Sequence, residues 1–171
     1  NSHETTVASI EKLADKELIF SSSDITDLDK LNGIFNQYHF DAIIHFAALK
    51  SVPDSFVSVS QYYDVNVNGT LNLLNLATHH GIKDFIFSSS AAVYGDPISC
   101  PLDEKHPLLP KSPYATTKMM GECIVADFAR NSKNMRAISL RYFNPIGAHR
   151  RRLIGDNPKG IQQNIMPAII A

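Results

Sequence analysis

Tyr114 and Lys118 are the residues whose types and spacing most directly suggest chemistry. They stand four positions apart in the segment SPYATTK at 112–118. Ser112 followed by Pro113 is typical of a helix start, and positions i and i+4 lie side by side on a helix surface. A free tyrosine phenol has a pKa of about 10, and a neighbouring ammonium lowers it by favouring the phenolate. The pair could therefore take a proton from an alcohol or sugar hydroxyl, although Tyr-x-x-x-Lys pairs also arise by chance.

The composition is that of an ordinary globular domain. The chain has 171 residues, of which 44% are hydrophobic and 19% charged, with a net charge of -1. This balance indicates no large basic surface for nucleic acid. We find no apolar run near the roughly 20 residues that span a membrane, and no signal-like start. We therefore expect no nucleic-acid or membrane partner and a cytoplasmic location.

A metal site is not expected. The two cysteines, Cys100 and Cys123, lack the spacing of metal ligands, and the seven histidines are scattered. Free thiols in a reducing compartment are the default interpretation of two isolated cysteines.

Helices and strands are predicted to alternate along the chain. Apolar residues at helical spacing predict helices at 5–14, 26–38, 53–80 and 113–131. Short apolar runs predict strands at 17–24, 41–48 and 135–145, and a strand running into a small-residue loop at 84–95. Alternation of this kind favours an α/β fold with a doubly wound, parallel, Rossmann-type sheet.

Polar residues gather where these strands end. They are Asp24, the stretch 45–50, the serines at 88–90 and the pair 143–144. Ligands of open α/β sheets bind outside the carboxyl ends of the strands. We therefore expect the functional site at this edge of the sheet.

Five blocks of sequence resemble one known family. They are HFAALKSV (45–52), YYDVNVNGTLNLL (62–74), FIFSSSAAVYGD (85–96), SPYATTK (112–118) and RYFNPIGAH (141–149). In this order they resemble the UDP-galactose 4-epimerases, members of the extended short-chain dehydrogenase/reductase family. The resemblance covers nearly the whole chain.

The resemblance implies a bound NAD, a UDP-hexose substrate and transient oxidation at C4 of the sugar. Tyr114 would take the C4 hydroxyl proton while a hydride passes to NAD. The 4-keto sugar would then turn and take the hydride back on its other face. Lys118 would favour the phenolate and bond the nicotinamide ribose, and Ser90 would donate a hydrogen bond to the reacting oxygen. Without the family, the Ser90 hydroxyl would be read as capping the end of its strand.

Further binding residues follow from the same resemblance. Besides Tyr114 and Lys118, the cofactor-binding positions are Asp24, Ile25, Phe46, Ala47, Ala48, Lys50 and Phe143. The substrate-binding positions are Ser90, Ala91, Ala92, Tyr114, Tyr142, Asn144 and Asn164. Taken alone, Phe46 would be a core residue, Lys50 a surface charge and Asn164 a loop asparagine.

The chain also departs from the family pattern. It has no G-x-x-G-x-x-G turn, whose glycines let backbone amides approach a pyrophosphate. In a sheet ordered 3-2-1-4-5-6, the strands at 17–22 and 41–46 would then flank a gap. We expect a fragment or a marginally folded remnant, with residues 1–149 as a partial NAD-binding domain and 150–171 as the start of the substrate region. Basic residues at 150–152 replace small ones, and Val65 stands where some members have a cofactor-contacting asparagine.

Other functions stay open at this point. Sugar-nucleotide dehydratases carry an Asp-Glu pair where this chain has Ala91 and Ala92, which disfavours dehydration. A decarboxylase or an N-acetylhexosamine epimerase of the same family is less easily separated. A catalytically inactive interaction module is the third alternative. In the family, helices corresponding to 53–80 and 113–131 pair between subunits, which implies a homodimer.

Overall fold

The fold is that of a computed structural model, which describes residues 4–147, 149–151 and 153–154. The chain divides into two compact units. One unit spans residues 23–143, and the other combines residues 1–22 with 144–171. In the second unit, helix α1 (Glu4–Ala14) matches the helix predicted at 5–14, and Glu11 accepts a hydrogen bond from the backbone N–H of Leu18.

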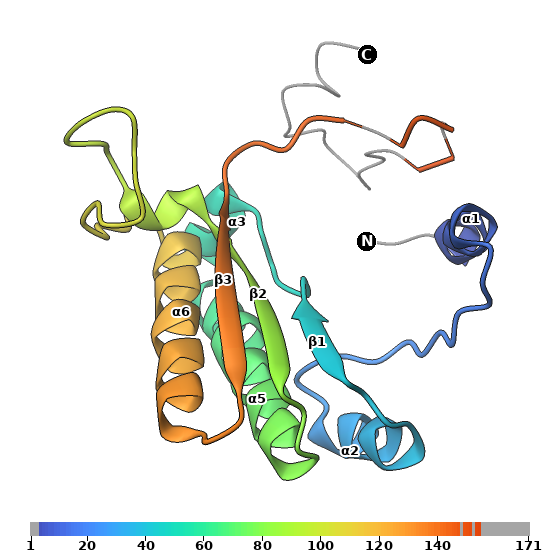
Figure 1. Ribbon diagram of the computed structural model, residues 1–171. Helices are drawn as coiled ribbons and strands as arrows, with labels where there is room; N and C mark the ends of the chain where they lie inside the picture. The colour runs from blue at the N-terminus through green and yellow to red at the C-terminus, as the bar shows by residue number, and fades with distance from the viewer. Residues whose placement is uncertain (1–3, 148, 152, 155–171) are drawn as a thin grey trace. The chain divides into compact units, whose positions relative to one another are not determined.

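The larger unit is built on a three-stranded parallel sheet (Figure 1). Its strands lie in the order β1 (Ala42–His45), β2 (Asp84–Ser90) and β3 (Arg136–Tyr142). Because all three run in the same direction, their carboxyl ends meet at one edge of the sheet. The predicted α/β class and parallel Rossmann-type sheet are confirmed, and β1 lies at the sheet edge as expected.

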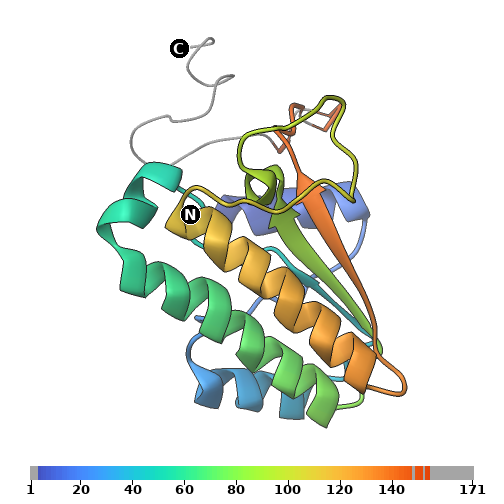
Figure 2. The same ribbon diagram turned by 90° about the vertical axis from the view of Figure 1, so that its left-hand side faces the viewer.

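Helices cover one face of this sheet. Helix α6 (Pro113–Asn131) runs beside α5 (Gly69–His79) over the strands, and α2 (Leu28–Gln37) contacts α5 (Figure 2). The core between these layers is apolar and includes Leu31, Phe35, Leu74, Ala77, Phe85, Phe87 and Val125. Burial of such side chains is the main stabilising contribution to a layered α/β fold.

The strand predicted at 17–24 is wrong. Residues 17–24 form no strand, and Ile19 and Phe20 are exposed. Apolar residues favour an extended chain, but a strand also needs a hydrogen-bonding neighbour. Within the described residues, the sheet offers no strand that pairs with this segment.

The single helix predicted at 53–80 is also wrong. The segment consists of α3 (Val52–Val57), α4 (Val59–Tyr63), the π-helix η1 (Asp64–Asn68) and α5. Ser58, with φ -114° and ψ 45°, leaves the helical region between α3 and α4. A π-turn is rare and is often found near functional sites.

The remaining elements follow the predictions closely. Helix α6 occupies the predicted span 113–131, while α2, β1 and β3 are shorter at their ends than expected. Strand β2 runs into the short 3-10 helix η2 (Ala91–Tyr94). The domain boundary expected after residue 149 stays a prediction.

Candidate active site

Helix α6 begins as its sequence predicts. The Ser112 side chain accepts a hydrogen bond from the Ala115 N–H at 3.1 Å, and Pro113 occupies the first turn. This cap fixes where the helix starts, and therefore where its first two turns project. Tyr114 is half-buried and Lys118 is only 4% exposed.

Lys118 is a buried ammonium held by the end of β2. Its Nζ donates a hydrogen bond to the Ser88 carbonyl at 2.8 Å and lies 5.1 Å from the centre of the Phe87 ring. Burial lowers the pKa of Lys118 to about 8, because the charged form is poorly solvated there. The contact requires a close approach of α6 to β2. A Cβ added at Gly121 would lie 2.4 Å from Cζ of Phe87.

Ser90 is the last residue of β2 and also caps η2. Its Oγ accepts a hydrogen bond from the Ala92 N–H at 3.2 Å. This is the capping role that the residue alone suggests. A hydroxyl that accepts one bond keeps its own hydrogen for another acceptor, so the cap is compatible with donation to a reacting oxygen.

Asn66 holds the loop that follows β1, and sequence reasoning missed it. Its Oδ1 accepts from the Leu49 N–H at 2.8 Å, and its Nδ2 donates to the Leu49 carbonyl and to Thr117 Oγ1, each at 3.0 Å. Thr117 directly precedes Lys118, so Asn66 joins the predicted cofactor loop to α6. An asparagine inside an apolar helical stretch was the sequence signal that could have revealed this role. A buried side-chain amide needs hydrogen-bond partners, so such an asparagine is expected to join neighbouring segments. The sequence interpretation considered only Val65, its neighbour.

His45 ends β1 beside this cluster and is 3% exposed. Its Nε2 lies 3.0 Å from Thr70 Oγ1, and Thr70 donates its own hydrogen to the Asn66 carbonyl at 2.6 Å. Nε2 must therefore carry the ring hydrogen and donate it. Burial, followed by the charge of Lys118, lowers the pKa of His45 to about 4. The imidazole is thus a neutral link between β1 and α5.

The predicted adenine-contacting pair lies before α2. Asp24 accepts from the backbone N–H and the hydroxyl of Thr26, and these bonds lower the pKa of its carboxyl. The Ile25 carbonyl accepts from Asn72 on α5 at 3.0 Å. Asp24 is therefore a fixed, ionised acceptor before the helix layer.

The other predicted positions divide into four groups, the first being Ala91 and Ala92, which are partly covered and open η2. Phe46, Ala47 and Lys50 are exposed after β1, with Ala48 partly covered beside them. Phe46 lies 6.2 Å from Tyr142, and Phe143 lies 6.5 Å from Tyr94, between ring centres, so the aromatic side chains gather at the carboxyl edge. Asn144 belongs to the other unit, and Asn164 lies outside the described residues, so both stay predictions.

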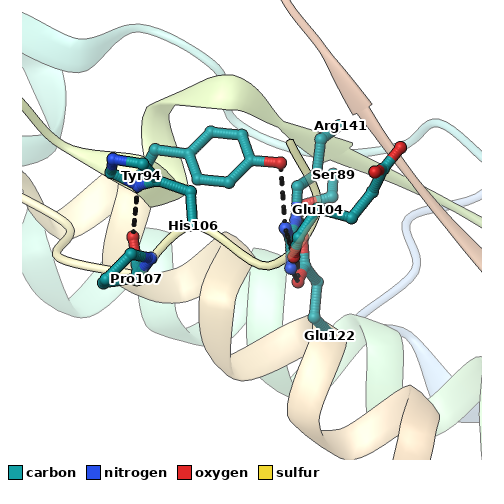
Figure 3. A network of polar contacts seen from close by, with 7 residues as sticks. All are labelled: Ser89, Tyr94, Glu104, His106, Pro107, Glu122 and Arg141. Carbon is teal, nitrogen blue, oxygen red and sulfur yellow. Dashed lines mark hydrogen bonds and ion pairs between the residues drawn. The ribbon is translucent and has the colours of Figure 1, made fainter. Parts of the chain in front are cut away.

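A buried polar network extends from this edge between β2, β3 and α6 (Figure 3). Arg141 forms two parallel hydrogen bonds to Glu122, at 2.9 and 2.8 Å, and also bonds the Tyr94 hydroxyl and the Glu104 carbonyl. Ser89 donates to Glu122 at 2.5 Å. Of these residues, the sequence interpretation had singled out Ser89 alone, within the serines at 88–90, and had given it no role of its own.

Metal ligands and membrane helices are not found among the described residues. Within them, no three His, Cys, Asp or Glu side chains are grouped to hold a metal ion, and Cys100 and Cys123 are exposed free thiols. No helix in the described part of the chain has the length and apolarity to span a bilayer.

Comparison with known proteins decides the family. A family model described as GDP-mannose 4,6 dehydratase matches residues 1–170. The chain belongs to this family. UDP-glucose 4-epimerase 2 of Oryza sativa subsp. japonica is a 44% identical relative, matched over 99% of this chain and 42% of its own length. The UDP-glucose 4-epimerase of Homo sapiens is 42% identical, over 94% of this chain and 46% of its own length.

A solved structure in the family has the same fold. The UDP-glucose 4-epimerase of Bifidobacterium longum, in complex with NAD+ and UDP, matches with a TM-score of 0.94 and 37% identity, over 99% of this chain and 51% of that one. These findings confirm the predicted resemblance to the UDP-galactose 4-epimerases. The chain spans less than half the length of the two relatives from rice and human.

Proposed function

We propose that this chain is the central part of an NAD-dependent UDP-glucose 4-epimerase, which interconverts UDP-galactose and UDP-glucose through transient oxidation at C4. One observation carries the proposal. Lys118 is buried against the Ser88 carbonyl, one helical turn after Tyr114 and beside the strand end that holds Ser90. The relatives named UDP-glucose 4-epimerase support the same activity.

Tyr114 is the general base of the proposed reaction. Its phenolate accepts the C4 hydroxyl proton, and Ser90 donates a hydrogen bond to the same oxygen as its charge develops. NAD, when bound, would supply the reversible hydride-acceptor chemistry for oxidation and re-reduction at C4. Tyr114 then gives the proton back, so no net oxidation occurs. Lys118 has two further N–H groups besides the one given to Ser88, and these can hold the phenolate and a ribose hydroxyl.

The residues at the carboxyl edge fit a nicotinamide dinucleotide. Phe46 and Phe143 present exposed rings, each 62% accessible, against which a flat base can lie. Ala47 and Ala48 leave the backbone after β1 open to close approach, and Lys50 supplies an exposed positive charge for phosphate. Asp24 and Ile25 would contact the adenine.

The sugar pocket is proposed from the small and polar residues that the resemblance assigns to the substrate. Ala91 and Ala92 leave room for the keto sugar to turn, and Tyr142, Asn144 and Asn164 would contact the nucleotide sugar. The two alanines carry no acid or base, which favours epimerisation over the dehydration that the family description names. A decarboxylase or an N-acetylhexosamine epimerase remains the second candidate, and turnover on a panel of UDP-sugars separates it.

We also propose that the active enzyme is a cytoplasmic homodimer paired through the helices of 53–80 and 113–131. Helices α3 and α4 pack against α6, and α3 exposes Phe56 and Val57, with Val57 87% accessible. Exposed apolar side chains on adjacent helices are typical of an interface. Light scattering of the active protein tests this proposal: the molar mass should be that of two chains.

The decisive experiment compares the 171-residue chain with a longer version that includes a glycine-rich strand-turn-helix. The 171 residues contain no G-x-x-G-x-x-G, so we expect little NAD binding and little or no turnover by the chain alone. The longer protein should retain NAD and interconvert UDP-galactose and UDP-glucose. An inactive interaction module predicts that the longer protein also fails to bind NAD and to turn over, and that result would reject the enzyme proposal.

A further inference from the structure

Glu122 continues the row of side chains that begins with the proposed catalytic pair. Tyr114, Lys118 and Glu122 are successive i, i+4 and i+8 positions of α6, so they share one helix face. Glu122 is 8% exposed, although no role in proton transfer is assigned to it. A carboxylate is rarely buried unless it is paired, so its partners indicate its task.

Two hydrogen bonds join this face of α6 to consecutive residues of β2. Lys118 donates to the Ser88 carbonyl at 2.8 Å, and Ser89 donates to Glu122 at 2.5 Å. Helix α6 connects β2 to the parallel strand β3, so it runs back against the direction of β2. Lys118 therefore lies nearer the carboxyl edge than Glu122, yet it bonds the earlier strand residue. The two bonds cross, and sliding α6 along β2 in either direction would stretch one of them.

Arg141 fixes the carboxylate from the neighbouring strand. Ser89 and Arg141 are directly paired in the sheet, so their side chains lie on the same face, and both contact Glu122. The guanidinium bonds both carboxylate oxygens, with 19% of the Arg141 side chain and 9% of the Glu122 side chain exposed. A bidentate pair of this kind adds geometric restraint as well as energy. The ion pair with Arg141 thus orients the Glu122 carboxylate toward Ser89 (Figure 3).

We propose that Glu122, oriented by Arg141, is a positioning residue for catalysis: its bond with Ser89 sets the register of α6 on β2. Ser90 directly follows Ser89, and Tyr114 lies two helical turns before Glu122. The register of α6 on β2 therefore determines how the Ser90 hydroxyl and the Tyr114 phenol are placed around one substrate oxygen. This inference rests on the proposed function. Displacement of a reacting group by about 1 Å can cost about 100-fold in rate.

Ser89→Ala is the sharpest variant, because it removes the bond to Glu122 and leaves the Arg141 ion pair in place. Ser132→Ala is the matched control. Ser132 is a serine just beyond α6 whose Oγ accepts from the Met135 N–H at the far end of the helix. Ser89→Thr is the rescue variant, since it keeps the hydroxyl and a β-branched residue suits a strand. All three are made in the longer, NAD-retaining protein.

The expected result is a fall in kcat of about tenfold or more for Ser89→Ala, with KM for UDP-galactose changed less than twofold. Ser132→Ala should keep the parental kcat, and Ser89→Thr should recover most of the loss. Crystal structures should show α6 shifted along β2 in Ser89→Ala alone. A merely structural role would lower stability without a selective loss of kcat. If Ser89→Ala matches Ser132→Ala in kcat, the inference is overturned.

The crystal structures separate this inference from the proposed function. If the parent protein does not interconvert the two UDP-hexoses, the proposed function fails, while the position of α6 in Ser89→Ala still tests the register. An unmoved helix then overturns the positioning role of Glu122. A shifted helix supports it.

Discussion

Asn66 and Leu49 exchange two hydrogen bonds, as two residues of neighbouring strands would. The amide oxygen accepts from the Leu49 N–H at 2.8 Å, and the amide nitrogen donates to the Leu49 carbonyl at 3.0 Å. One side chain on a π-helix thereby satisfies the backbone of the loop proposed to carry the cofactor. The same nitrogen reaches Thr117 on α6, so the loop and the catalytic helix share one anchor.

In the longer, NAD-retaining protein, replacing Asn66 with Leu should lower the free energy of unfolding and release NAD. The Leu49 backbone would lose both partners, at a cost of about 2–4 kcal/mol. Asn68→Ala is the matched control, because Asn68 is an exposed asparagine of the same π-helix that bonds only Asp64 in the described contacts. Its free energy of unfolding should change by less than about 0.5 kcal/mol. Equal urea midpoints and equal NAD content for the two variants would contradict this role.

In the longer, NAD-retaining protein, Tyr114→Phe should abolish epimerisation and leave NAD bound. Removing a general acid-base group costs about 100-fold to 10,000-fold in rate, and the phenyl ring keeps the packing of α6. The measurement is turnover of UDP-galactose together with the absorbance of protein-bound cofactor. A variant that retains a tenth of the parental turnover would exclude Tyr114 as the base.

Lys118 should make stability rise with pH between about 8 and 10.5. Burial lowers the pKa of this ammonium from 10.5 to about 8 in the folded protein. Between these values the unfolded chain binds more protons than the folded one, so raising the pH favours folding. The full effect is roughly 3 kcal/mol, at about 1.4 kcal/mol for each pKa unit.

Urea unfolding at pH 7 to 10 measures this contribution, with Lys118→Met as the reference. Other groups titrate equally in both proteins, so the difference between them isolates Lys118. The free energy of unfolding should increase with pH more steeply in the parent than in Lys118→Met. Parallel pH profiles would show that folding does not lower the pKa of Lys118.

Gly121→Ala should destabilise the protein, in spite of the better helix propensity of alanine. The added Cβ would lie 2.4 Å from Cζ of Phe87, so α6 or the ring must move, at a cost of about 1–3 kcal/mol. Gly33→Ala on α2 is the control, because no atom lies within 4 Å of the new Cβ. That change should stabilise by about 0.5–1 kcal/mol. Thermal unfolding of both variants should therefore shift in opposite directions.

Local sequence signals predicted α6 well and the segment before α5 poorly, for a physical reason. The start of α6 is encoded by Ser112 and Pro113, which act within one turn. The π-turn places Asn66 against partners in the loop after β1 and on α6, which no local pattern contains. The strand expected at 17–24 failed for the same reason, because pairing depends on a distant neighbour.

The site was predicted in part. Tyr114, Lys118 and Ser90 were named because family motifs surround them. Ser90 ends β2 and Lys118 bonds the Ser88 carbonyl of the same strand, while the catalytic roles of all three stay predictions. The sequence shows that Glu122 follows Tyr114 and Lys118 at intervals of four residues. Its proposed positioning role, however, depends on its hydrogen bonds with Arg141 on β3, which the sequence does not show. Local sequence patterns do not predict contacts between elements that are far apart in the sequence.

The π-helix constrains the number of residues between α4 and α5. Its five residues, Asp64–Asn68, connect α4 to α5 without a break in the chain direction. Losing one residue would restore regular α-helical turns, but it would rotate everything on one side by about 100°. The apolar face of α5 or the amide of Asn66 would then point away from its partners. Insertions and deletions should therefore be selected against in Asp64–Asn68.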